Sequence, residues 1–144
     1  MKRMFVNVPV TDLERAKTFY EAVGFSINPT FSDHNAACVV VEDPHNYFMI
    51  HTREFFQTMT SLPIGDPAKN PTAATTIFLD SREEVDATVA AGVGAGGVEP
   101  GEPADYGFMY QRGLTDPDGN VIDFGWMDPV AAEHGPEAVA SPQG

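Results

Sequence analysis

Apolar and polar positions in the first half of the chain predict a strand, a helix and three further strands. Residues 6–10 favour a strand that ends near Pro9, because proline has no amide hydrogen for a neighbouring strand. The next segment spaces its apolar side chains three and four residues apart, which predicts a helix with one buried face, ending at Gly24. These helical positions are Leu13, Ala16, Phe19, Tyr20 and Val23. The three further strands are predicted near residues 25–30, 36–41 and 47–52.

The second half repeats this order. A strand over 75–79 precedes a helix that carries Val85 and Val89 on its apolar side and ends in a run of glycines between 92 and 97. Two strands are then predicted near 107–114 and 120–126. They are joined by Asp116-Pro117-Asp118-Gly119-Asn120, a strong hairpin signal because proline fixes one turn position and glycine accepts a positive φ.

Both predicted helices begin with the same capping signal. Thr11 stands three residues before Glu14, and Ser81 stands three residues before Glu84. In such a capping box, the hydroxyl accepts from the third helical amide and the carboxylate reaches back to the cap. We expect Thr11 and Ser81 to be the caps, about half a chain apart, which indicates an internal repeat.

A proline-containing segment separates the two halves. Residues 54–71 show no regular period, and the stretch 61–71 contains three prolines, which predicts an irregular linker. Residues 129–144 are rich in Ala, Pro, Gly and Glu and are expected to form a mobile tail or a weak cover. The repeat predicts two βαβββ units that together form a curved sheet around a cavity. One continuous α+β sandwich is the alternative.

Composition and charge exclude several classes of function. The chain of 144 residues carries 8 Lys and Arg against 21 Asp and Glu, a net charge of −13. Nucleic acids and anionic membranes are therefore not expected as partners. A single cysteine, Cys38, suits a reducing compartment, and the polar start of the chain does not resemble a signal peptide. We expect an acidic cytoplasmic protein.

Two segments resemble a known family. Residues 5–16 (FVNVPVTDLERA), followed by Phe19-Tyr20 and Gly24-Phe25, together with residues 116–124 (DPDGNVIDF), resemble the vicinal oxygen chelate superfamily. That superfamily contains glyoxalase I, extradiol dioxygenases, fosfomycin-resistance enzymes and bleomycin-resistance proteins. The resemblance extends over about residues 4–127.

The resemblance implies an α+β fold and a domain organisation. Two tandem βαβββ modules are expected to form a curved mixed sheet around a cavity, as in glyoxalases, bleomycin-resistance proteins and dihydroxybiphenyl dioxygenase. They would make one domain over residues 1–128, with a homodimer as the expected assembly. Its parts are module 1 over about 1–53, the linker over 54–71 and module 2 over about 72–128, followed by the tail over 129–144.

The resemblance also implies where a metal would be held. In metal-dependent members, ligands come from the first and last strands of each module, and these positions fall on Phe5, Ala74, Asp123 and either Ile50 or His51. Phe5 and Ala74 have no donor atom, whereas a divalent metal needs several converging oxygen or nitrogen ligands. The expectation is therefore no cofactor, with a divalent metal at an atypical site as the alternative.

Several of these residues are candidates for binding or catalysis. His51 and Asp123 are the candidate catalytic residues, as base or ligand. Neighbouring strand residues face opposite sides, and the register matching the family turns Ile50 toward the cavity and His51 away. Asp123 would share the cavity face with residues 121 and 125. The candidate ligand-binding residues are Phe5, Asn7, Ile50, Ala74, Tyr110 and Asp123; Asn7 could instead tie down a loop, and Tyr110 could instead belong to the core.

Three functions follow from these expectations. The first is a glyoxalase-like protein without the usual metal site that binds or sequesters a small organic molecule, for which a cationic ligand would suit the acidic chain. The second is a metal-dependent glyoxalase or dioxygenase-type enzyme that uses His51 and Asp123. The third is an interaction module without a ligand.

Overall fold

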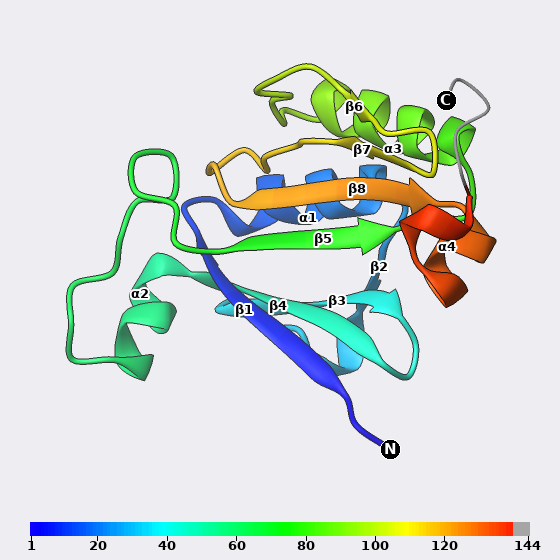
Figure 1. Ribbon diagram of the computed structural model, residues 1–144. Helices are drawn as coiled ribbons and strands as arrows, with labels where there is room; N and C mark the ends of the chain where they lie inside the picture. The colour runs from blue at the N-terminus through cyan, green and yellow to red at the C-terminus, as the bar shows by residue number, and fades with distance from the viewer. Residues whose placement is uncertain (140–144) are drawn as a thin grey trace.

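The computed structural model describes residues 1–139 and contains two four-stranded sheets (Figure 1). The first has the order β1-β4-β3-β2 and the second the order β5-β8-β7-β6. The strands are β1 (Met4–Val10), β2 (Ser26–Asn28), β3 (Ala36–Glu42), β4 (Asn46–Thr52), β5 (Ala74–Phe78), β6 (Ala104–Asp105), β7 (Met109–Arg112) and β8 (Val121–Met127). The α-helices are α1 (Leu13–Ala22), α2 (Arg53–Phe56), α3 (Arg82–Gly94) and α4 (Pro129–His134), and the 3-10 helices are η1 (Pro29–Phe31), η2 (Gln57–Met59) and η3 (Pro136–Ala138).

The two sheets have the same pairing pattern, which confirms the predicted pair of βαβββ units. In each sheet the first strand is parallel to the last, β1 to β4 and β5 to β8, and the remaining pairs are antiparallel. The parallel pairs require a long crossover, which the helix and the two intervening strands supply. The edge strands β1 and β5 belong to separately hydrogen-bonded sheets, so the expected curved sheet is divided at this boundary.

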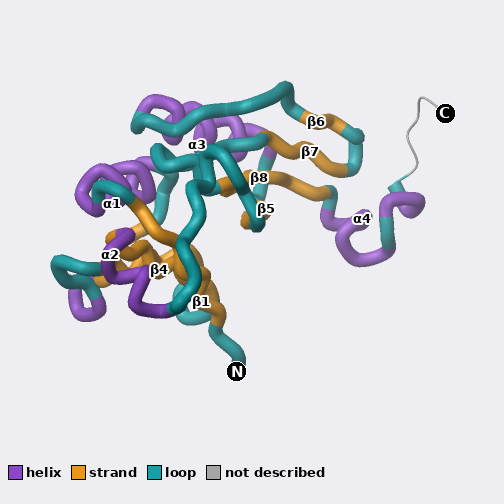
Figure 2. Tube along the Cα trace, turned by 90° about the vertical axis from the view of Figure 1, so that its left-hand side faces the viewer, coloured by secondary structure: helices purple, strands orange, loops and turns teal. Residues whose placement is uncertain are grey.

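The linker and the tail contain more regular structure than their composition suggested. Residues 53–59 form α2 and η2 directly after β4, so the irregular part of the linker begins near Thr60. In the tail, α4 begins with Pro129 after an Asp128 cap and buries Ala131. Figure 2 shows α4 beyond the end of β8, apart from the other helices. The last tail residues, 140–144, lie outside the described residues.

The predicted cap of the first helix is wrong by one residue. The Oδ1 atom of Asp12 accepts from the Arg15 amide at 3.0 Å, so Asp12 caps α1. Thr11 instead bonds to the hairpin of the second half, where a more distant carboxylate is available. The second cap is confirmed: Ser81 Oγ accepts from the Glu84 amide at 3.0 Å, while the Glu84 carboxylate accepts from the Asp80 amide at 3.1 Å.

A single hydrophobic core joins the two halves. Phe19 and Tyr20 of α1 and Phe124 of β8 are fully buried. Phe48 of β4 is 2% exposed. The ring of Phe25 lies between the two sheets, with centroids 6.4 Å from Phe48 and 6.2 Å from Phe124. In Figure 2, α1 and α3 lie next to one another on the same side of the sheets. Neither half therefore has a closed core without the other.

The glycines near the end of α3 permit close packing instead of forming only a flexible turn. A Cβ at Gly92 would lie 2.6 Å from Leu114 Cδ2, and a Cβ at Gly97 would lie 2.6 Å from the Thr115 carbonyl oxygen and 2.7 Å from Phe19 Cε2. The absence of side chains at these two positions lets α3 approach the β7–β8 connection and the ring of Phe19. Among residues 1–139, no helix is long and apolar enough to cross a membrane.

Candidate functional site

Each sheet has one face toward the helices and one open face. In β1, Val6 and Val8 contact the core, while Phe5 and Asn7 are exposed on the opposite, open face. In β8, Ile122 and Phe124 are buried against the core, so Asp123 lies on the open face, as the sequence predicted for residues 121, 123 and 125.

The predicted orientation of Ile50 is wrong. Ile50 is fully buried in the core with Phe48, on the side of β4 that faces the helices. His51 therefore shares the open face with Asn7 and Phe5, and the parallel register places Pro9 opposite His51. A shift of one residue in the assumed strand register moves every side chain to the opposite face of the sheet. The residues around Ile50 are continuously apolar, so they show no apolar–polar alternation that would indicate which face is buried.

His51 and Asn7 form a pair on this open face. The Nε2 atom of His51 lies 2.9 Å from Asn7 Oδ1, so the Nε2–H donates and the amide oxygen accepts. The imidazole is only 4% exposed, and its Nδ1 atom has no partner among the described residues. Phe55 stacks on the ring at 5.5 Å and Phe56 lies at 6.2 Å. Burial lowers the pKa of His51, and this effect outweighs the negative charge of Asp33, which raises it. The ring is therefore held neutral.

Asp123 is half-buried on the open face of the second sheet. Its Oδ1 atom accepts from the Leu114 amide at 3.2 Å and so holds the connection between β7 and β8. Its neighbour in the parallel register is Thr76, and Ala74 precedes Thr76 by two residues on the same face. Asp123 and Ala74 therefore lie on one face, as expected, but the carboxylate is already engaged with the backbone.

Tyr110 faces away from Asp123, contrary to its predicted place in a ligand pocket. It pairs with Trp126, and its hydroxyl donates to Asp86 Oδ1 of α3 at 2.6 Å. The guanidinium of Arg82 lies 5.1 Å from the centroids of the Tyr110 and Trp126 rings. Tyr110 therefore joins β7 to α3, which is the structural alternative that the sequence left open.

These residues do not assemble a metal site within one chain. Phe5, Asn7 and His51 lie on the open face of the first sheet, and Ala74 and Asp123 on that of the second. In the part of the chain that the structure describes, no group of three or more His, Cys, Asp or Glu side chains could hold a metal ion. The donor set does not fit the divalent metal of the superfamily.

A pocket of about 400 Å³, the linker pocket, lies between the two halves instead. Its walls are residues 6–9 of β1, Thr75 of β5 and residues 120–122 at the start of β8. Phe48 of β4, Phe56 and linker residues between Thr60 and Ala73 complete the lining. No described residue that lines this pocket carries a charge, and Asn7, Asn120 and several threonines supply its polar groups.

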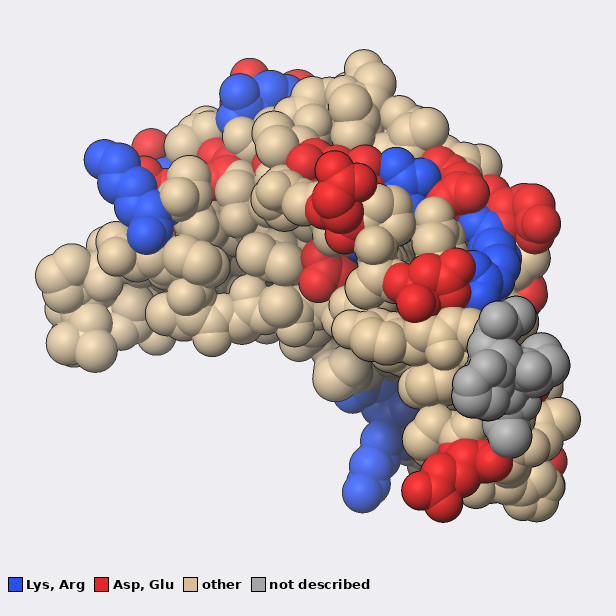
Figure 3. All heavy atoms as spheres, turned by 45° about the horizontal axis from the view of Figure 1, so that its top comes forward, with Lys and Arg blue, Asp and Glu red and all other residues tan. Residues whose placement is uncertain are grey.

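Sequence reasoning found Asn7 but missed the rest of the linker pocket. Residues 57–65 contain no charged side chain although the chain is strongly acidic, which is a signal that this segment contacts an apolar surface. In Figure 3, the left-hand end of the surface, where Figure 1 places the linker, is almost without charged side chains. Pro67 and Pro71 in the lining stiffen the linker part of the wall.

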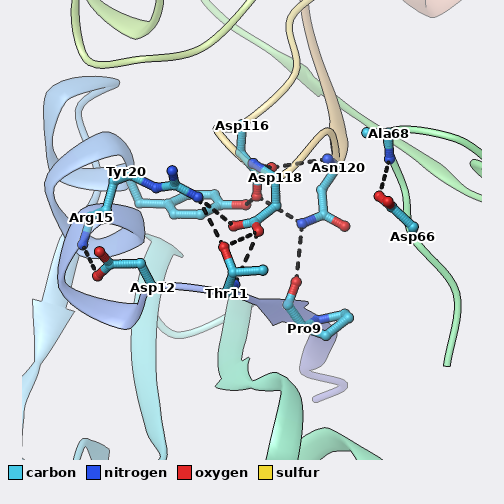
Figure 4. A network of polar contacts seen from close by, with 10 residues as sticks. All are labelled: Pro9, Thr11, Asp12, Arg15, Tyr20, Asp66, Ala68, Asp116, Asp118 and Asn120. Carbon is cyan, nitrogen blue, oxygen red and sulfur yellow. Dashed lines mark hydrogen bonds and ion pairs between the residues drawn. The ribbon is translucent and has the colours of Figure 1, made fainter.

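A polar network fixes the wall of the linker pocket at the hairpin (Figure 4). Asn120 Nδ2 donates to the Pro9 carbonyl oxygen at 3.3 Å and to Asp116 Oδ2 at 2.8 Å. The buried Asp116 also accepts from the Tyr20 hydroxyl at 2.9 Å. Burial raises the pKa of Asp116, against the hydrogen bonds from Asn120 that favour the carboxylate. The network therefore connects β1, α1 and the hairpin at the boundary between the halves.

Two further contacts attach the hairpin to its surroundings. Asp118 Oδ1 accepts from the Thr11 amide at 3.0 Å and from the Thr11 hydroxyl at 2.7 Å (Figure 4). At Gly119, which has φ +97°, a Cβ would lie 2.7 Å from the backbone of Ala68, so only glycine lets the linker approach the turn this closely. The linker wall of the pocket thus rests directly on the hairpin.

Comparisons with known proteins support the same fold. A family model described as bleomycin resistance protein-like N-terminal matches residues 2–42. A hypothetical protein from S. aureus is 24% identical, with a TM-score of 0.73, covering 88% of this chain and 94% of that chain. A glyoxalase/bleomycin resistance protein from Albidiferax ferrireducens T118 is 29% identical, with a TM-score of 0.65, covering 85% and 95%.

A third similar structure has a function in its name. TnmS3, an antibiotic binding protein from Streptomyces sp. CB03234, is 27% identical, with a TM-score of 0.63, covering 88% of this chain and 96% of that chain. The search of curated proteins gives no match. Together, the N-terminal match, the paired βαβββ units and these structures show the fold of glyoxalase/bleomycin resistance proteins, in agreement with the resemblance of the sequence to the vicinal oxygen chelate superfamily.

Proposed function

We propose that this protein binds a small, uncharged organic molecule in the linker pocket, without the metal of the catalytic members of the superfamily. The observation that carries the proposal is a pocket of about 400 Å³ between the halves whose lining is mainly apolar and uncharged. Ligand pockets of this kind combine apolar walls with a few polar groups that fix orientation. Asn7 and Asn120 are suited to that orienting role because their side chains offer amide groups.

Binding is favoured over catalysis by the positions of the candidate catalytic residues. Neither His51 nor Asp123 lines the linker pocket, and the two belong to different sheets. The printed name of TnmS3, an antibiotic binding protein, also supports a binding role for this chain. The buried thiol of Cys38 fits a reducing compartment, and we place the protein in the cytoplasm.

We further propose that the working form is a homodimer. The open face of the first sheet exposes a large apolar side chain, the ring of Phe5, which is 47% exposed. A second copy of the chain that covers this face would remove the ring from water, which is the main favourable term in association. The candidate residues Phe5, Asn7 and His51 would then lie at the interface.

Filling the linker pocket tests the binding function. Ala73 is exposed and lines the pocket, so Ala73→Phe would place a ring in its opening. We expect the neutral dye Nile red to bind the natural chain with saturation, and Ala73→Phe to weaken that binding at least tenfold, measured by dye fluorescence. The matched control is Ala87→Phe on the exposed side of α3, which lies outside both described pockets and is expected to bind the dye normally.

Two results contradict this function. One is unsaturable dye fluorescence in the natural chain, and the other is unchanged dye affinity in a folded Ala73→Phe variant. Thermal unfolding followed by circular dichroism establishes that both variants fold.

A further inference from the structure

A second pocket, the edge pocket, lies at the other end of the boundary between β1 and β5. Its volume is about 340 Å³, and it is lined by parts of β1, β3, β4 and β5 together with Phe25. It shares Val6, Phe48 and Thr75 with the linker pocket, so the two pockets adjoin at these side chains. The edge pocket contains none of the superfamily's metal positions: Phe5, Ala74 and Asp123 are all absent from its lining.

Aromatic rings form much of its wall. Phe25, Tyr47, Phe48 and Phe78 all line the edge pocket. Phe25 and Phe48 are stacked, with centroids 6.4 Å apart and planes inclined by 28°. Tyr47 is held from outside by Phe5, which stacks on it at 4.7 Å. Phe78 is 48% exposed, so an aromatic face remains available to a ligand.

The electrostatics of the edge pocket differ from those of the linker pocket. Glu42 is the one charged side chain among the described lining residues. No Lys, Arg or His within residues 1–139 forms an ion pair with it. Next to it, Asp43 adds a second carboxylate, whose Oδ1 accepts from the Tyr47 hydroxyl at 2.5 Å. Arg3 acts on Tyr47 as an opposing positive charge, whereas the net charge of −13 favours a negative potential over the whole chain.

We propose that the edge pocket is a separate binding site for a flat organic cation, such as an aromatic quaternary amine. Tyr47 and Phe78 line the pocket with aromatic rings, and the ring quadrupole of such side chains attracts a cation. Glu42 supplies the opposite charge and needs no other partner to be displaced first. This site does not depend on a ligand in the linker pocket.

Berberine, a planar quaternary cation whose fluorescence rises in apolar surroundings, is the probe for this site. We expect saturable binding with one berberine per chain, and a dissociation constant about fivefold to tenfold higher in Glu42→Gln. Phe78→Ala is expected to weaken binding to a similar degree through loss of an aromatic wall. Raising the salt concentration should weaken berberine binding to the natural chain more than to Glu42→Gln.

Matched variants separate this site from general acidity and from the linker pocket. Glu83→Gln removes an exposed carboxylate of α3 outside both pockets, and we expect berberine to bind it normally. Ala73→Phe should also bind berberine normally, whatever its effect on Nile red. The proposal is overturned if berberine does not saturate, if Glu42→Gln and Glu83→Gln weaken it equally, or if only Ala73→Phe abolishes binding.

Discussion

At the scale of single residues, His51 is the most unusual group on the open face. Its ring is buried between phenylalanines, Nε2 is bonded to Asn7, and the buried Nδ1 atom has no partner among the described residues. Protonation would add a second N–H where no acceptor is present, and an unsatisfied buried polar group costs about 1–3 kcal/mol. The neutral ring is therefore part of the folded state.

This predicts a stability loss in mild acid that depends on His51. Burial lowers the pKa of His51 in the folded chain, whereas the unfolded chain takes up the proton near its ordinary value of about 6.5. The unfolded state then binds more protons as the pH falls below about 6.5, and the free energy of unfolding falls by at most about 1.4 kcal/mol per pH unit. Urea unfolding at pH 7.5 and 5.5 measures this change.

His51→Gln should lose less stability between these two pH values than the natural chain. Ala87→Gln is the control, since Ala87 is exposed on α3 and the substitution changes no titratable group, so it should leave the pH dependence unchanged. Equal pH dependence in the natural chain and His51→Gln would contradict the prediction.

At the scale of elements, the packing of α3 depends on Gly97. Glycine is needed there because a side chain would clash with neighbouring atoms, and not because of the backbone conformation of Gly97. A Cβ at Gly97 would meet the Thr115 carbonyl oxygen at 2.6 Å and the Gly92 carbonyl oxygen at 2.9 Å. These are backbone atoms, which cannot rotate away, so the helix end would have to move. We expect Gly97→Ala to lower the free energy of unfolding by about 1–3 kcal/mol, measured by urea denaturation.

Gly94→Ala is the matched control for this prediction. Gly94 is the last residue of α3, and a Cβ there would meet nothing within 4 Å. Alanine at this position should leave stability unchanged or raise it by up to about 1 kcal/mol, because it reduces the freedom of the unfolded chain. Similar losses in both variants would mean that close packing at Gly97 is not the cause.

Elements were largely predictable from the sequence because their signals are local. The stripe of Leu13, Ala16, Phe19 and Tyr20 depends on spacing alone, and all four are buried in α1 as predicted. The orientation of Ile50 and the role of Tyr110 were not predictable, because each depends on a partner strand or helix distant in sequence. The linker pocket was missed for the same reason, since its walls come from both halves and from the proline segment.

At the scale of the whole molecule, the open face of the first sheet with Phe5 determines the expected assembly. If a second copy covers this face, the natural chain should have twice its mass of 15.6 kDa in size-exclusion chromatography with light scattering. Phe5→Glu should shift the protein toward the monomer, because a charge at the interface would lose its water. Val93→Glu is the control, since Val93 is similarly exposed at 46% but lies on α3. A natural chain that stays monomeric at high micromolar concentration would contradict the assembly.

Phe25 contacts Phe48 of the first half and Phe124 of the second, so the two halves share one core and are expected to unfold together. Separating the halves would expose buried rings on both sides and break the bonds from Asn120 to Pro9 and from Tyr20 to Asp116. Partial melting of one half would therefore leave the other with much of its own core in water. Although the repeat suggests two bodies, heat or urea is expected to convert the chain in a single cooperative step, and both pockets would disappear with it.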